Sequence, residues 1–301
     1  YIFSFMNLIQ NNSEDKYNLD IIMYQNNTPQ SEKWDLDKMN IRFENLVKFI
    51  ETNANNARTT AIIFSETEIP YVISERDNIL RFLQSKLDNN TIILIGAIRK
   101  NTDENTYYNT MFKINSKSID YFDKQILVPF GEYIPLKKIF SFINSWAQGS
   151  SDFSIGNNKR SLKLINNINF IPTICYENIF FEKIITNQNF KNELIINITN
   201  DSWFGKYQGP YQHFYQSILR STESNKYLIR VSNNGISAVI SPKGEILKST
   251  NLNKKMILKY TLNAKNIFNI YFKQKYIIFY LYLILMLIIC TVYQYIQKNE
   301  K

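Results

Sequence analysis

The chain has 301 residues, 45% of them hydrophobic, and a formal net charge of +9. This length and composition allow one large globular domain and exclude a largely disordered chain. The lysines are spread along the chain and form no basic stripe, so no nucleic-acid partner is expected.

Cysteine, histidine and glycine are all scarce. Two cysteines cannot build a disulfide framework, and one histidine without a Cys-x-x-Cys pair excludes the usual structural zinc sites. The spacing of the eight glycines matches neither the dinucleotide-binding motif nor the phosphate-binding loop motif. We therefore expect chemistry that needs no metal and no organic cofactor.

Residues 1–17 are interpreted as the stub of a preceding membrane segment and a polar linker. They show no initiator methionine and no signal-peptide pattern, and their apolar run is too short to span a bilayer. The chain is therefore expected to be cut from something longer, with a globular domain that begins at residue 18.

Short apolar runs alternate with longer helical patterns through residues 18–265. Buried strands are predicted at 20–24, 60–64, 91–95, 169–174 and 193–199, and helices at 34–53, 74–87, 178–186 and 211–225. Two further strands, 227–232 and 235–241, follow each other directly. This alternation favours a layered α/β domain.

Residues 134–146 form a short amphipathic stretch rich in aromatic side chains. One interpretation is an interfacial lid that admits acyl chains, and the alternative is a loop packed on its own domain.

Residues 276–296 contain no charged side chain. About 20 such residues span a bilayer as a helix, and tyrosines near both ends suit the membrane interfaces. We therefore predict a transmembrane helix, since a buried core helix is seldom uncharged on every face over this length. Lysines on both sides leave its orientation undecided.

Three reactive groups lie at the ends of predicted segments. Cys175 ends a strand-like stretch and opens a helix-like one, where a helix N-terminus and a nearby cation favour the thiolate. Glu66 follows another strand and Lys124 precedes a Pro-Phe-Gly turn. Segment ends are where α/β folds carry reactive side chains.

Acyl transfer assigns a role to each group. Because His213 is the sole imidazole, Glu66 is the better general base for the Cys175 thiol. Lys124 and the backbone N–H after Cys175 are suited to stabilising an oxyanion. Taken singly, the three have ordinary structural explanations as a buried thiol, a capping carboxylate and a surface lysine.

Short motifs accompany these residues in chain order. They are Pro-Gln-Ser-Glu-Lys-Trp at 29–34, Ser-Glu-Thr-Glu-Ile-Pro at 65–70, Lys-Gln-Ile-Leu-Val-Pro-Phe-Gly-Glu-Tyr-Ile-Pro at 124–135, Ile-Cys-Tyr-Glu at 174–177, and Thr-Asn-Asp-Ser-Trp-Phe-Gly at 199–205. Together they resemble the carbon-nitrogen hydrolase (nitrilase) superfamily and, within it, the bacterial apolipoprotein N-acyltransferase family. The resemblance runs from about residue 18 to residue 260. One departure is Phe64-Ser65, where the family usually has Trp-Pro.

The resemblance implies a nitrilase-like α-β-β-α sandwich over residues 18–265, followed by the transmembrane helix at 276–296. It implies a catalytic triad of Glu66, Lys124 and Cys175. The residues that it implies as supporting or substrate-binding are Glu132 beside the lysine or the glutamate, Tyr176 and Glu177 beside the thiol, and Trp34 and Phe130 as walls of an acyl-chain pocket or ordinary core aromatics.

The implied reaction moves an acyl chain from a membrane phospholipid, through a Cys thioester, to the amino-terminal diacylglyceryl-cysteine of an apolipoprotein. It implies the bilayer as a partner, a place in the bacterial inner membrane, and a catalytic domain on the periplasmic side. Two alternatives stay open. An amidase or nitrilase-type hydrolase would have no need of residues 276–296, and an inactive truncated remnant would explain why the family's preceding membrane bundle is not in this sequence.

Overall fold

The computed structural model describes residues 16–54, 57–74, 78–135, 152–165, 168–265 and 270–299. Two compact units are present, one formed by residues 12–266 and the other containing the carboxy-terminal helix. Most of the predicted lid and of the predicted amino-terminal stub lies outside the described residues.

The first sheet has seven strands among the described residues, in the order β13-β1-β2-β4-β5-β6, with β3 added beside β4. Strands β1, β2 and β4 run parallel, whereas β13, β5 and β6 pair antiparallel with their neighbours. The strand bounds are β1 Lys16–Gln25, β2 Thr60–Ile63, β3 Val72–Ser74, β4 Thr91–Asn101, β5 Thr106–Asn115, β6 Ile119–Asp123 and β13 Met256–Lys265.

The second sheet has six strands in the described part of the chain, in the order β12-β11-β10-β9-β8-β7. Its centre is parallel, with β9 between β8 and β10. The bounds are β7 Leu162–Ile165, β8 Ile168–Ile174, β9 Leu194–Thr199, β10 Tyr227–Ser232, β11 Ala238–Ile240 and β12 Ile246–Ser249.

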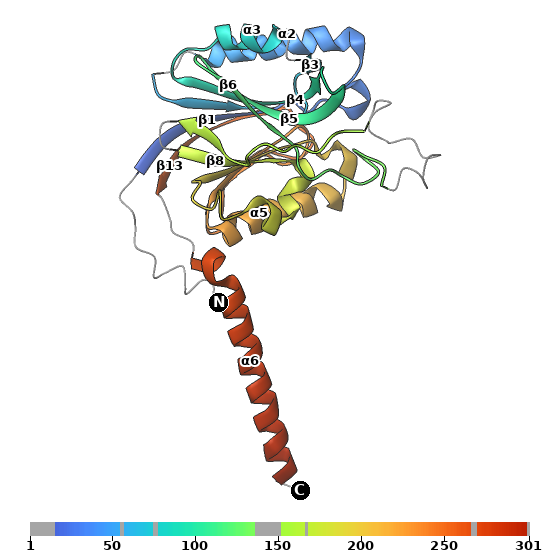
Figure 1. The fold of residues 1–301 in the computed structure, drawn as a ribbon. Coiled ribbons are helices and arrows are strands. Elements are labelled where there is room, and N and C mark those ends of the chain that lie inside the picture. The colour runs from blue at the N-terminus through green and yellow to red at the C-terminus, as the bar shows by residue number, and fades with distance from the viewer. Residues whose placement is uncertain are drawn as a thin grey trace. The chain divides into compact units, whose positions relative to one another are not determined.

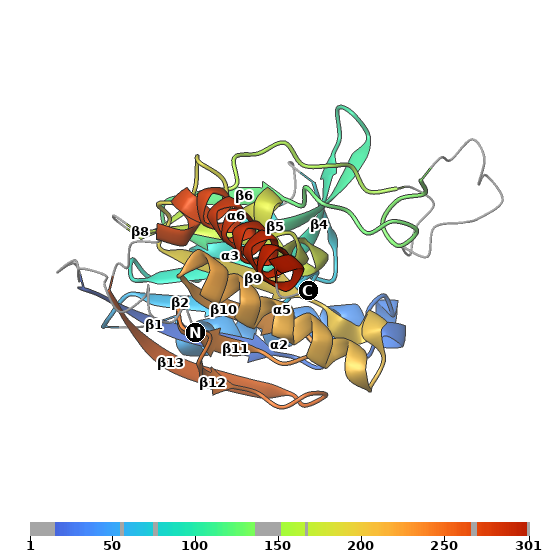
Figure 2. The same cartoon turned by 90° about the horizontal axis from the view of Figure 1, so that it is seen from below.

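Helices cover the outer faces of both sheets (Figure 1). Helices α2 (Leu36–Asn53) and α3 (Ile79–Ser85) lie over the first sheet, and α5 (Gln208–Ser224) lies along the second, seen from below in Figure 2. Shorter elements are η2 Gln30–Glu32, η3 Cys175–Ile179, α4 Phe181–Ile184 and η4 Asp201–Phe204. The domain is the α-β-β-α sandwich that the sequence predicts.

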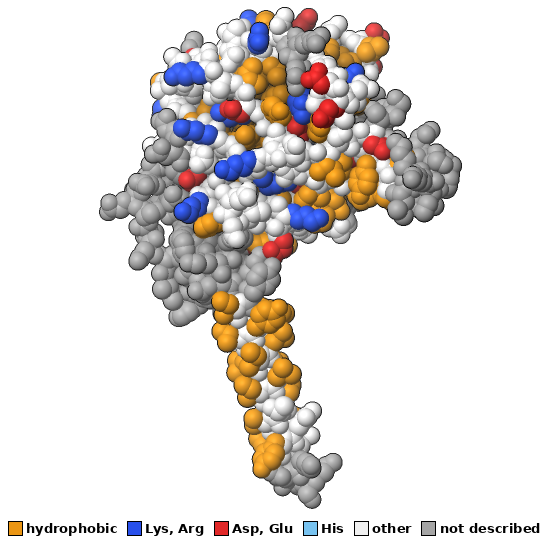
Figure 3. Space-filling view, in the orientation of Figure 1, with side chains coloured by type: hydrophobic (Ala, Val, Ile, Leu, Met, Phe, Trp, Pro, Cys, Tyr) orange, Lys and Arg blue, Asp and Glu red, His pale blue; other side chains and the backbone are white. Residues whose placement is uncertain are grey.

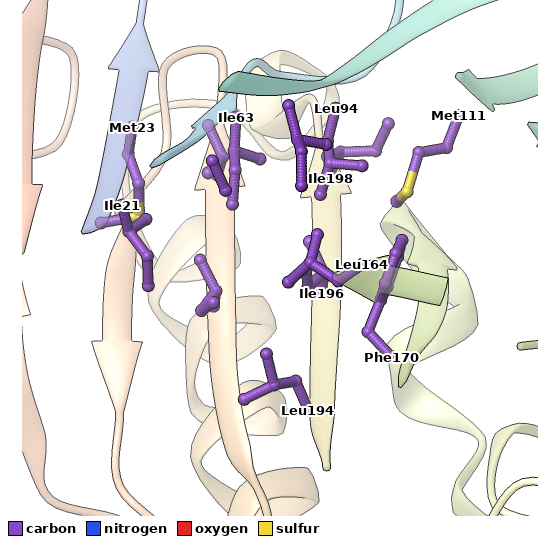
Figure 4. Close-up of a cluster of buried hydrophobic side chains, with 14 of the residues drawn as sticks. Ile21, Met23, Ile63, Leu94, Met111, Leu164, Phe170, Leu194, Ile196 and Ile198 are labelled. Atoms are coloured by element: carbon purple, nitrogen blue, oxygen red, sulfur yellow. The ribbon is translucent and has the colours of Figure 1, made fainter. Parts of the chain in front are cut away.

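Successive side chains of a strand point to opposite faces of its sheet, and in this domain they form two apolar cores. In β1, Leu19, Ile21 and Met23 belong to the core between the sheets, whereas Ile22 and Tyr24 belong to the core beneath α2 and α3. This division follows from the period of two along a strand, which sends successive side chains to opposite faces. Figure 4 shows side chains of both sheets pointing towards each other in the inner core.

The predicted helix at 178–186 is wrong in its extent. The chain instead forms the 3₁₀ helix η3, which already begins at Cys175, and then the four-residue helix α4. Phe180 interrupts the two because its φ of −102° and ψ of 80° are not helical. The other predicted helices and the seven predicted strands are present, most with bounds shifted by a few residues.

Helix α6 (Ile270–Asn299) forms the described part of the other unit. Its residues Phe279–Gln297 have a mean hydropathy of 2.0, and none of this span is buried. Figure 3 shows apolar side chains along much of the helix. By length and composition, α6 is the one helix among the described residues that is able to cross a membrane.

Candidate active site

Cys175 lies at the corner where β8 ends and η3 begins. Its φ is +51°, in the left-handed region that costs a side-chain-bearing residue about 1–2 kcal/mol. The side chain is 7% exposed, and it belongs to the inner core cluster while also lining a cavity. The corner therefore delivers the thiol to the end of the sheet instead of continuing the strand.

Glu66 occupies a turn directly after β2 and Phe64, and it is buried. The turn lies against β4, with the Gly96 N–H donating to the Ser65 carbonyl at 3.2 Å. A Cβ on Gly96 would come within 2.7 Å of Glu66 Cα and 2.4 Å of Thr67 N. The absence of a side chain at Gly96 thus permits the close approach that positions Glu66.

Lys124 follows β6 and is almost fully buried. Its backbone N–H donates to the Asn109 carbonyl, and its ammonium donates to Glu132 Oε1 at 2.8 Å. The same Nζ lies 3.8 Å from Glu66 Oε1. One ammonium thus lies between two carboxylates.

Asn109, in β5, joins the same two carboxylates and was not identified from the sequence. Its Nδ2 donates to Glu66 Oε1 at 2.7 Å and to Glu132 Oε1 at 3.1 Å. Two like charges this close would repel, so the amide and the Lys124 ammonium together make the arrangement stable. An isolated asparagine in a strand carries no motif, which is why sequence reasoning misses it.

Glu177 is fully buried and does not line the cavity, although it was expected to shape the pocket. Its Oε1 accepts hydrogen bonds from the Gln125 and Ile126 N–H groups and from Arg160, and its Oε2 accepts from Ile174 N–H and Arg160. Glu177 and Arg160 therefore clamp the segment after Lys124 onto the corner that carries the thiol.

The surroundings of Cys175 favour its neutral thiol form. Burial, followed by the Glu66 carboxylate, raises the pKa of Cys175 to about 12, while Lys124 acts in the opposite direction. The helix that begins at the thiol is a short 3₁₀ turn, so it provides little helix dipole. At neutral pH the resting group is therefore a thiol, and it needs a base to become nucleophilic.

Lys124 remains an ammonium. Burial alone would lower the pKa of Lys124, but the carboxylates of Glu132 and Glu66 outweigh burial and hold its pKa above the usual range. A fixed positive charge of this kind can stabilise negative charge that develops on a neighbouring substrate oxygen.

Lys33 is a second buried lysine at the site, and it too was missed. Its ammonium donates to the Glu66 backbone carbonyl at 3.0 Å. Burial lowers the pKa of Lys33, although the Glu66 carboxylate opposes this effect. Lys33 follows η2, so the Pro-Gln-Ser motif delivers it to the turn that carries Glu66.

These groups surround one cavity of about 270 Å³. Trp34 and Tyr176 line it as expected, but Phe130 does not. Phe130 has a φ of +61° in the Pro129–Tyr133 turn and is 44% exposed. The lining residues are Gln30, Lys33, Trp34, Glu66, Thr67, Ile98, Asn109, Lys124, Val128, Gly131, Glu132, Phe153, Cys175, Tyr176, Asn200, Trp203 and Phe204. A polar cluster therefore faces a mainly aromatic and aliphatic wall.

Asp201, His213 and Arg230 form a buried cluster outside the cavity lining. Burial alone would raise the pKa of Asp201, but the Arg230 guanidinium and His213 lower it, so the carboxylate is ionised. Burial and Arg230 lower the pKa of His213, so its imidazole is neutral at neutral pH. The sole histidine is thus held in an internal charge network.

The chain matches the family described as Carbon-nitrogen hydrolase over residues 23–269. Among curated proteins, it is 38% identical over 243 residues to an apolipoprotein N-acyltransferase of Rickettsia typhi, covering 77% of this chain and 47% of that protein. It is 36% identical over 252 residues to the protein of the same name from Rickettsia prowazekii, covering 82% of this chain and 50% of that protein. The chain therefore spans about half the length of the curated relatives that it matches.

The fold is also found in solved structures. Saccharomyces cerevisiae Nit3, described as a member of branch 10 of the nitrilase superfamily, superposes with a TM-score of 0.61 at 16% sequence identity. The match covers 82% of this chain and 90% of that structure. At this identity the likeness concerns the fold alone.

Proposed function

The chain belongs to the carbon-nitrogen hydrolase family, and from this membership we propose that it is the catalytic part of an apolipoprotein N-acyltransferase. The family match covers residues 23–269, and we assign residues 18–265 to the catalytic domain and residues 276–296 to a transmembrane helix. The names of the curated relatives support this choice within the family.

In the first half-reaction, Cys175 Sγ attacks an ester carbonyl of a phospholipid. Glu66 takes the thiol proton, because the high thiol pKa leaves no thiolate at rest, and Lys124 stabilises the oxyanion. The ester C–O bond then breaks, and Glu66 returns the proton to the departing alcohol. The products are a lysophospholipid and an acyl thioester on Cys175.

In the second half-reaction, the α-amine of the acceptor's diacylglyceryl-cysteine attacks the thioester carbonyl. Glu66 accepts a proton from the amine, the C–S bond breaks, and the sulfur regains a proton from Glu66. An amide and a free thiol result. Covalent catalysis of this kind divides one difficult exchange into two easier steps.

One observation carries the proposal. The cavity of about 270 Å³ is lined both by the three reactive groups and by Trp34, Tyr176, Trp203 and Phe204. Apolar and aromatic walls with a few convergent polar groups suit a ligand that presents a hydrocarbon chain and one reactive carbonyl.

We further propose the bacterial inner membrane as the site of action, with the catalytic domain on the periplasmic side. The exposed apolar span of α6 and the bacterial origin of the relatives support this assignment. Both substrates are lipids in the bilayer, so an anchored enzyme would meet them without releasing them into water.

Intact-protein mass spectrometry tests the first half-reaction. The full chain is incubated with vesicles that contain phosphatidylethanolamine, and we expect a mass increase of one fatty acyl group that hydroxylamine removes. Cys175→Ala abolishes the adduct, whereas Cys290→Ala, which removes the other cysteine, retains it.

Adding a synthetic diacylglyceryl-cysteine peptide tests the second half-reaction. The adduct should disappear as the peptide gains an amide-linked acyl group. Release of free fatty acid without peptide acylation would instead identify a hydrolase, and the absence of any adduct on Cys175 would contradict the proposal.

A further inference from the structure

Thr199 is the last residue of β9, beside the end of β8. The two strands are parallel, and Ile198 is paired with Ile174, so Thr199 lies across from Cys175. Thr199 is fully buried, and against the larger effect of burial its hydroxyl lowers the pKa of the Cys175 thiol through a side-chain hydrogen bond. Thr199 does not line the cavity.

The Thr199 hydroxyl has a second partner. It donates a hydrogen bond to Asp201 Oδ1 at 3.2 Å. A hydroxyl carries a single proton and can donate it to one acceptor at a time. While the sulfur is a neutral thiol, which is a weak acceptor, the Asp201 carboxylate is the stronger competitor for that proton.

Asp201 does not depend on Thr199. The Arg230 guanidinium donates to Oδ1 at 3.0 Å and to Oδ2 at 2.8 Å, and His213 Nδ1 lies 2.8 Å from Oδ1. If Thr199 turns away, the carboxylate keeps strong partners, and no buried acceptor is left unsatisfied. The hydroxyl is therefore free to change partner at little cost.

We propose that Thr199 is a further catalytic residue, whose hydroxyl turns from Asp201 to the Cys175 sulfur as negative charge develops there. The inference rests on the proposed function in taking Cys175 as the nucleophile. Thr199 does not accept the thiol proton, which passes to Glu66, but donates its own hydrogen bond to the sulfur that has lost it.

The timing of this bond gives it catalytic value. A hydrogen bond that forms only with the charged sulfur stabilises the transition state without stabilising the resting thiol, and only such differential interactions raise the rate. The negative charge of Asp201 by itself opposes a thiolate, and Arg230 neutralises that charge. The network thus orients the Thr199 hydroxyl without repelling the developing anion.

The test is the rate at which iodoacetamide alkylates Cys175, followed by mass spectrometry of the Cys175 peptide between pH 7 and pH 11. Because the thiol pKa is raised to about 12, the wild-type rate should climb throughout this range, by about tenfold per pH unit. Thr199→Val keeps the shape of the residue and removes the hydroxyl, and we expect alkylation about tenfold slower at each pH.

Matched variants separate this role from packing. Thr199→Ser keeps the hydroxyl but loses the methyl group, and it should react at nearly the wild-type rate. Thr199→Ala removes the hydroxyl without risk of overpacking, and its alkylation should also be about tenfold slower than that of the wild type, so it provides the test if the valine variant does not fold. Thr173→Val removes a buried hydroxyl from neighbouring β8 and should leave alkylation unchanged.

Two results would overturn the inference. One is alkylation by Thr199→Val and Thr199→Ala at the wild-type rate, and the other is slowing by Thr199→Ser or Thr173→Val as great as that by Thr199→Val. Alkylation requires no lipid, so its outcome is independent of the acyltransferase proposal. A chain that never forms the acyl adduct but shows the Thr199 dependence would reject only the proposed function.

Discussion

At the residue scale, Gly96 determines where Glu66 lies. The turn that carries Glu66 rests on the backbone of β4, and Gly96 is the point of closest approach. The atoms that a new Cβ would meet belong to the backbone, which cannot move aside as a flexible side chain can.

Gly96→Ala should therefore displace Glu66 from Lys124 and Asn109. We expect acyl-adduct formation on Cys175 to slow at least about tenfold, because small misplacements of a catalytic group reduce rates steeply. Overpacking should also lower the free energy of unfolding by about 1–3 kcal/mol. Adduct formation by mass spectrometry and urea unfolding measure the two effects, and wild-type adduct formation would show that the turn tolerates the methyl group.

Part of the site can be predicted residue by residue. Glu66, Lys124, Cys175, Glu132, Trp34 and Tyr176 belong to short motifs, and the structure brings all six to one cavity. Asn109 cannot be found in this way, since it is an ordinary strand residue whose partners Glu66 and Glu132 lie tens of residues away. Thr199 opens the motif at 199–205, but its place beside Cys175 follows from the pairing of β8 with β9. Their importance arises from strand pairing, which no local spacing encodes.

At the element scale, the site depends on a clamp between two connections. The corner after β8 carries Cys175, and the segment after β6 carries Lys124. Glu177, paired with Arg160, joins these two connections by accepting hydrogen bonds from the backbone just after Lys124. The Glu177–Arg160 pair is almost fully buried, so removing either partner leaves the other as a buried, unpaired charge at a high cost in stability.

A double-mutant cycle tests this clamp. Glu177→Gln or Arg160→Met alone should lower the free energy of unfolding by about 3–5 kcal/mol, because each leaves a buried group without its counter-charge. The double variant should lose less than the sum of the two, since it leaves neither charge unpaired. Urea unfolding measures all three, and additive losses would mean that the pair does not act as a unit.

Element prediction succeeds where burial creates a clear pattern. Strands such as β2, β8, β9 and β10 are buried along almost their whole length and rich in Ile and Leu, and α2 and α5 have buried and exposed faces. Strand β5 was missed because its first residues are polar or only half-buried, and β12 because it is exposed throughout. Strand β5 lies between β4 and β6, and β12 lies at an edge of the second sheet; both are held by pairing with neighbours, which hydrophobic periodicity does not report.

At the scale of the whole molecule, the chain combines an independent α/β unit with an exposed apolar helix. Residues 12–266 form a compact unit with two cores of their own, so they should fold without α6. Among the described residues nothing buries the span Phe279–Gln297, and leaving it in water would be costly.

Deleting residues 270–301 should therefore change where the protein is found. The full chain should stay with membranes after an alkaline wash, whereas the truncated chain should appear in the aqueous fraction with an unchanged thermal unfolding transition for the domain. Immunoblotting of the fractions measures this. Release of the full chain by the wash would argue against a transmembrane helix.

The pairing of β1 with β13 has a mechanical consequence. Lys16 opens β1 and is paired with Lys265, which closes β13, so the polypeptide enters and leaves the domain at adjacent points. A force applied between these two points would break the hydrogen bonds between β1 and β13 one after another, starting from the Lys16–Lys265 pair. The pairing of β1 with β13 therefore has little resistance to tension applied between Lys16 and Lys265, and it stays intact only while these two ends of the domain move together.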